Sequence, residues 1–125
     1  MKSNAVGWFE IYVQDMERAK AFYEAVFEVK LQKLPSPMPH LEMWAFQQDP
    51  QSYGAAGALV KIQGYPSGGN STLVYFHCYD CQVEEKRALQ AGGRVEHSKM
   101  AIGEYGFISH VFDTEGNLIG LHSRQ

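Results

Sequence analysis

Residues 9–27 read FEIYVQDMERAKAFYEAVF, and this stretch combines a strand pattern with a helix pattern. In its first five residues, apolar side chains alternate with Glu10 and Tyr12, which predicts a strand with two different faces. Asp15 suits an N-cap, because its side chain can accept hydrogen bonds from the free N–H groups of a first helical turn. From Met16 onward, apolar residues recur at helical spacing, which predicts an amphipathic helix of about 12 residues.

The same order of patterns returns in the second half of the chain. Residues 72–79 read as an aromatic strand, and Asp80 is placed to cap a helix that ends before Gly92-Gly93. Residues 107–112 and 117–123 read as two strands joined by a short turn. Gly116 at the fourth position of that turn fits a type I turn closed by a left-handed residue.

The repeat predicts an α+β fold built from tandem βαβββ modules. We expect a first module at residues 5–63, a linker at 64–71 and a second module at 72–125. One such unit is too small to bury its own sheet, so the two copies should close against each other as a single domain, 1–125.

Composition excludes several classes of function. The chain has 125 residues and a formal net charge of −3, which argues against nucleic-acid binding, because that requires a basic surface. It contains no apolar run of membrane-spanning length. The N-terminal residues lack the core of a signal peptide, and two cysteines cannot form a disulfide framework, so we expect a cytoplasmic protein.

Two motifs together resemble a known family. The first is Asp15-x-x-x-Ala19-x-x-Phe22-Tyr23, and the second is Asp-x-x-Gly-Asn at residues 113–117. In the tandem βαβββ context this is similar to the vicinal oxygen chelate superfamily, which includes glyoxalase I, bleomycin-resistance proteins and extradiol dioxygenases. The resemblance implies a half-open barrel around a cavity, with lyase, isomerase, oxygenase or pure binding activity.

The resemblance also implies where a metal ion would be held. Family members place ligands on the first and last strands of each module, which here correspond to Trp8, Gly57, Val74 and Gly120. None of these side chains has an electron pair to donate. We therefore expect no metal and no other cofactor.

The short turn at Gly116 fixes how the last two strands pair. It sets His110 opposite Gly120 and Ile108 opposite His122, and these residues should face the cavity. Trp44 is expected to reach either this cavity or a subunit interface. The predicted ligand-binding residues are Trp8, Glu10, Tyr12, Trp44, Leu59, Ile108, His110, Leu118 and His122.

Two functional hypotheses follow. In the first, the protein binds a small, partly aromatic molecule without a metal and sequesters it, as bleomycin-resistance proteins do. In the second, it is a glyoxalase-like lyase or isomerase, or a dioxygenase-related enzyme, that uses non-standard metal ligands or acid–base catalysis by Glu10, His110 and His122. Glu10 could instead pair with a cation such as Lys61. The family resemblance implies a homodimer in either case.

Overall fold

The structure is a computed structural model that describes residues 4–36 and 38–125. Its elements follow the predicted βαβββ order twice. The first set is β1 (Glu10–Tyr12), α1 (Met16–Phe27), β2 (Gln32–Leu34), β3 (Leu41–Ala45) and β4 (Ala58–Ile62). The second set is β5 (Tyr75–His77), α2 (Cys81–Gln90), β6 (Arg94–Ala101), the short 3₁₀ helix η1 (Gly103–Tyr105), β7 (Phe107–Phe112) and β8 (Leu118–Ser123).

Both helices begin at the predicted aspartates. The Asp15 carboxylate accepts a hydrogen bond from the Arg18 N–H at 3.0 Å, and the Asp80 carboxylate accepts one from the Gln82 N–H at 3.0 Å. These bonds satisfy N–H groups that have no partner within the first turn. Helix α1 ends at Glu28, which adopts the left-handed conformation with φ of 53°. The predicted length of this helix is confirmed.

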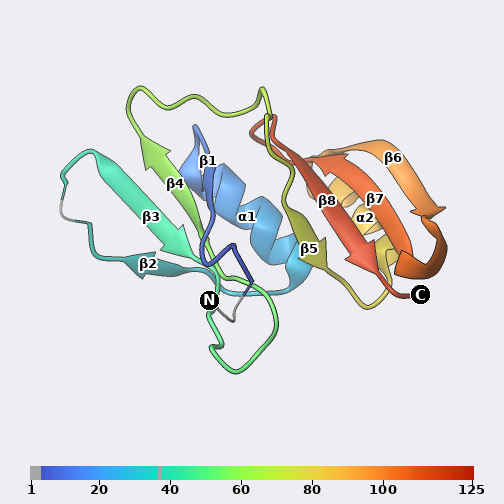
Figure 1. The fold of residues 1–125 in the computed structure, drawn as a ribbon. Helices are drawn as coiled ribbons and strands as arrows, with labels where there is room; N and C mark the ends of the chain where they lie inside the picture. The colour runs from blue at the N-terminus through green and yellow to red at the C-terminus, as the bar shows by residue number, and fades with distance from the viewer. Residues whose placement is uncertain (1–3, 37) are drawn as a thin grey trace.

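The strands form two four-stranded sheets, ordered β1-β4-β3-β2 and β5-β8-β7-β6. In each sheet the first strand of the module runs parallel to the last, and the other pairs are antiparallel. Figure 1 shows the sheets side by side, with β1 and β5 toward the middle. The sheets do not close on each other, which confirms the half-open arrangement of modules.

Helices and sheets share one principal core. Helix α1 packs on β4 and on α2, and α2 packs on β6, β7 and β8. The buried cluster between them draws on both modules, with Phe22 and Tyr23 from α1 and Leu121 from β8 among its members. Among the described elements, neither α1 nor α2 packs on the other face of either sheet, and we call these two surfaces, which carry Glu10 and His110, the open faces. No described helix is long and apolar enough to cross a membrane.

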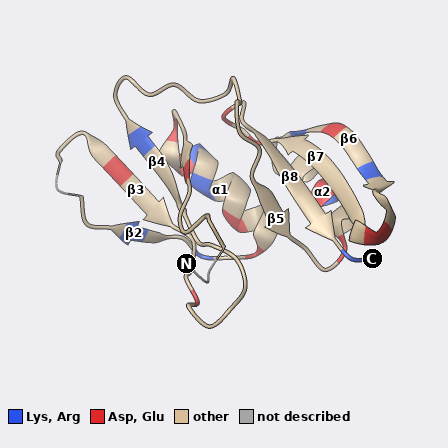
Figure 2. Cartoon of the chain, in the orientation of Figure 1, with Lys and Arg blue, Asp and Glu red and all other residues tan. Residues whose placement is uncertain are grey.

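The strands that begin each module are shorter than predicted. Ladder pairing of β1 covers only Glu10–Tyr12, and that of β5 covers only Tyr75–His77. The connection between β3 and β4, residues 46–57, is long, whereas β7 and β8 are joined by the predicted short turn with Gly116 at φ of 81°. Figure 2 shows acidic and basic residues interspersed over the described elements.

Candidate functional site

The open face of the first sheet presents a carboxylate between two aromatic side chains. The Trp8 indole N–H donates to Glu10 Oε2 at 3.4 Å, and the Tyr12 hydroxyl donates to Glu10 Oε1 at 3.1 Å. Alternation along the strand puts all three on one side. Tyr12 also stacks on Tyr65 with ring centroids 5.2 Å apart. Partial burial and the neighbouring Glu10 carboxylate raise the pKa of Tyr12.

The open face of the second sheet carries the predicted histidines. His110 lies opposite Gly120, and Ile108 lies opposite His122, so the predicted register of this hairpin is confirmed. Leu118 shares this face by alternation along β8. The His122 Nε2 atom lies 2.6 Å from the Tyr105 carbonyl oxygen in η1, which fixes the ring against that turn.

Two of the predicted binding residues lie on the other side of the first sheet. Leu59 pairs with Ile11 and is fully buried in the helix-side core, and Trp44 pairs with Leu59. Lys20 Nζ lies 3.3 Å from the centroid of the Trp44 ring. The expectation that Leu59 shares a face with Glu10 is wrong, and of the two places expected for Trp44, the cavity beside Glu10 is not where it lies. The physical reason is the register of β4, which places Ala58 beside Glu10.

The register of β4 differs by one residue from the expected one, and this difference also corrects the alignment of the two modules. Ala58 lies beside Glu10 as Gly120 lies beside Tyr75, so Ala58 and not Gly57 is the counterpart of Gly120. A methyl group at Gly57 would overlap Phe9, which belongs to the helix side.

This register allows a test of the metal site that the fold family implies. The residues that lie beside Ala58 and Gly120 on the first strands are Glu10 and Tyr75, in place of the expected Trp8 and Val74. Of these four residues, only Glu10 carries a carboxylate, and Tyr75 offers a phenol hydroxyl. In the described part of the chain no group of three or more His, Cys, Asp and Glu side chains is placed to hold a metal ion. The donor set therefore does not fit the family's metal.

Sequence reasoning missed three residues on the second open face. Tyr75 Oη lies 2.7 Å from His110 Nε2, and His97 Nδ1 lies 3.3 Å from His110 Nδ1. His77 stands beside His122 with ring centroids 6.4 Å apart. The available signal for Tyr75 and His77 was strand alternation. Cys78 faces the core, so Phe76 faces the core as well, and the residues between and before them, His77 and Tyr75, face the opposite side of the sheet. Burial, and then the nearby His97, lower the pKa of His110.

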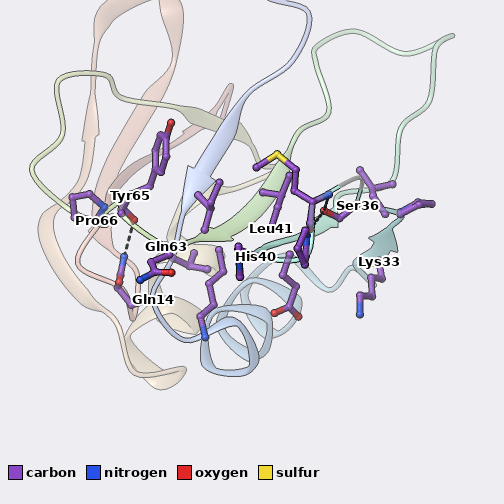
Figure 3. A pocket seen from close by; sticks show the side chains of 17 residues that line it. Gln14, Lys33, Ser36, His40, Leu41, Gln63, Tyr65 and Pro66 are labelled. Carbon is purple, nitrogen blue, oxygen red and sulfur yellow. Dashed lines mark hydrogen bonds between the residues drawn. The ribbon is translucent and has the colours of Figure 1, made fainter.

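Three cavities border the open faces. The largest, about 1100 Å³, lies at the end of the first sheet, where Figure 3 shows Gln14 hydrogen-bonded to the Tyr65 carbonyl and His40 and Leu41 nearby. A second cavity, about 530 Å³, lies between residues 46–56 and β5, and a third, about 310 Å³, includes His122. The second and third volumes fall within the range of about 300–1,000 Å³ that is usual for small-molecule sites, and the first lies just above it. Glu10 and His110 line none of these three cavities.

Comparison with protein families confirms the resemblance seen in the motifs. The sequence profile of the Glyoxalase/Bleomycin resistance protein/Dioxygenase superfamily matches residues 5–121. The chain belongs to this superfamily. A search of curated proteins finds no match.

Solved structures share the fold at low sequence identity. TnmS3, an antibiotic binding protein from Streptomyces sp. CB03234, is 24% identical with a TM-score of 0.72, and the match covers 100% of this chain and 99% of that one. Glyoxalase I from Zea mays is 18% identical with a TM-score of 0.73, covering 94% of this chain and 45% of the maize chain. This chain thus spans about half the length of the maize enzyme. Leishmania major glyoxalase I is 18% identical with a TM-score of 0.72, covering 98% and 88% of the two chains.

Proposed function

We propose that the protein binds a small, partly aromatic molecule on its open faces without a metal ion. The observation that carries this proposal is the set of residues that stands where the family resemblance implies metal ligands. Ala58 and Gly120 add no metal-binding group there, whereas Glu10 and Tyr75 keep hydrogen-bonding groups beside aromatic side chains. Such a surface can stack on a flat ring and hydrogen-bond to its substituents.

Two further observations support binding. Trp8 and Tyr75 remain 40% and 44% exposed, so their rings are available to a ligand. TnmS3, which matches this chain over nearly its whole length, is described as an antibiotic binding protein. The enzyme hypothesis receives less support, because no hydrogen bond between described residues joins Glu10 to His110 or His122.

The two tryptophans give a direct test, because they lie on opposite sides of the first sheet. Trp44→Phe leaves Trp8 as the only indole, on the open face, and Trp8→Phe leaves only Trp44, on the helix side. Each variant is titrated with bleomycin and with a neutral tricyclic quinone. We expect saturable fluorescence quenching in the Trp44→Phe protein and none in the Trp8→Phe protein. Absence of saturable quenching in the first variant, or equal quenching in both, contradicts the proposal.

Glu10 is tested in the same assay. Glu10→Gln removes the charge from the open face, and we expect about tenfold weaker binding of bleomycin, the size of one charge-assisted hydrogen bond. Glu17→Gln is the matched control, because Glu17 lies exposed on α1 and its ion-pair partner among the described residues is Lys20 at 3.7 Å. Equal affinities for wild type and Glu10→Gln would remove Glu10 from the site.

We further propose that the chain forms a homodimer through its open faces. Met100 at the end of β6 is 45% exposed, which leaves apolar area other than the ligand-facing Trp8 and Tyr75 for a second subunit to cover. Sedimentation equilibrium at micromolar concentration is expected to give the mass of two chains. A single-chain mass across the accessible concentration range contradicts the dimer and leaves ligand binding to the single chain.

A further inference from the structure

Three side chains from three strands form a continuous hydrogen-bonded chain on the open face of the second sheet. Tyr75 comes from β5, His110 from β7 and His97 from β6. The Tyr75 hydroxyl reaches one nitrogen of the His110 ring at 2.7 Å, and His97 reaches the other nitrogen at 3.3 Å. Both nitrogens of His110 are therefore engaged, and its ring is held between a phenol and a second imidazole.

The contact between two Nδ1 atoms restricts where the protons lie. One Nδ1 must carry a proton and the other must accept it. When His110 donates from Nδ1, its Nε2 atom accepts the Tyr75 hydroxyl proton. The Tyr75 oxygen then has lone pairs left over, and it can accept a hydrogen bond from a ligand hydroxyl.

The surroundings of His110 favour its neutral, proton-accepting form. Desolvation is the main cause of the lowered pKa of His110. The adjacent His97 lowers this pKa further, whereas Glu96 raises it. Gly120 on β8 presents no side chain to the ring, Tyr75 on β5 contacts it through its hydroxyl, and His122 lies diagonally across β8. His110 is therefore available as a proton acceptor at neutral pH, and the charge of a ligand oxyanion beside it is what stabilises the imidazolium that forms.

We propose that the Tyr75–His110–His97 chain binds and ionises an acidic hydroxyl, a phenol or an enol, of the bound small molecule. The ligand O–H bond breaks as its proton moves to the Tyr75 oxygen. The former Tyr75 proton moves at the same time to His110 Nε2, so the products are a ligand oxyanion, a neutral tyrosine and an imidazolium shared with His97. This inference rests on the proposed function, because it requires a ligand on the open faces.

The test uses 4-nitrophenol, a phenol that titrates close to neutral pH and whose phenolate alone absorbs visible light. Binding is measured by equilibrium dialysis, and ionisation by the absorbance of the bound probe as pH is varied. For wild type we expect the pKa of the bound probe to fall by about one unit, a tenfold change in ionisation. His110→Gln should bind the probe but lose this shift, and Tyr75→Phe should lose most of it. Tyr79→Phe is the matched control, because Tyr79 is 84% exposed before α2.

The outcomes separate this inference from the function on which it rests. A bound probe whose pKa is unchanged in wild type, or a shift that survives in His110→Gln, overturns the proton-transfer chain while ligand binding stands. Failure of wild type to bind 4-nitrophenol at all overturns the assignment of phenols as the ligand class. The tryptophan titrations with other aromatic probes then decide ligand binding independently.

Discussion

Gly120 determines whether Tyr75 can reach His110. A methyl group added at Gly120 would overlap the Tyr75 ring, because three atoms of that ring lie within 3 Å of where the methyl carbon would stand. We predict that Gly120→Ala displaces the phenol and destabilises the fold by about 1–3 kcal/mol, the usual cost of overpacking. Urea unfolding measures the loss. Tyr75→Ala in the same chain should restore most of it, and Gly7→Ala, whose added methyl meets nothing, should cost little.

Glu115 is the second residue whose surroundings make a sharp prediction. Burial raises its pKa, but hydrogen bonds from the Arg18 guanidinium at 2.7 Å and from the backbone N–H groups of Asp15 and Gln14 outweigh burial and lower the pKa of Glu115. A lowered folded-state pKa means that the carboxylate stabilises the fold above its unfolded-state pKa. That stabilisation is lost as pH falls through the folded-state value.

Glu115→Gln should therefore cost about 2 kcal/mol at neutral pH, where the charged hydrogen bonds are complete. The difference from wild type should begin to shrink near the ordinary glutamate pKa of about 4.3 and vanish at lower pH. Urea unfolding of both proteins across this range measures the difference. A gap that stays constant down to low pH would show that Glu115 contributes through shape and not through charge.

At the scale of elements, the long β3–β4 connection distinguishes the two modules. Residues 46–56 lie against β5 and border the cavity of about 530 Å³, and the Tyr53 ring packs at a tilt against His77 with ring centroids 5.1 Å apart. Tyr53 is 78% exposed, so Tyr53→Ala should change the free energy of unfolding by no more than about 0.5 kcal/mol. Affinity for the tricyclic quinone should fall severalfold, measured by quenching of Trp8. Unchanged affinity would place the ligand away from this connection.

The same contrast between elements explains what the sequence could predict. The β7–β8 hairpin is joined by a short turn, so local geometry fixes its register, and the facing of Ile108 and His110 is correct. The β1–β4 and β5–β8 pairs are parallel and join strands far apart in the chain, so no turn sets their register. A one-residue error therefore placed Leu59 on the open face, and the contact of Tyr75 with His110 became visible only once three strands were assembled.

At the scale of the whole molecule, a buried polar network joins the two modules. The Tyr23 hydroxyl of α1 donates to Asp113 Oδ2 at 2.6 Å, and the Asn117 amide donates to the Tyr12 carbonyl at 2.9 Å. Asn117 Oδ1 accepts the Gly68 N–H at 2.6 Å, which ties the linker to the same turn. Burial outweighs these hydrogen bonds and raises the pKa of Asp113. Neither module could keep this network alone.

A shared core and a shared network predict that the chain unfolds in one step, and the sequence supplies a separate probe for each module. Both tryptophans lie in the first module, and both cysteines lie in the second, with Cys81 fully buried in the common core. We expect urea unfolding followed by tryptophan fluorescence and by thiol labelling of Cys81 in a Cys78→Ala protein to give coincident midpoints. Asn117→Ala should lower both midpoints together. Midpoints that separate would show that the 64–71 linker joins two independent units, contrary to a single domain.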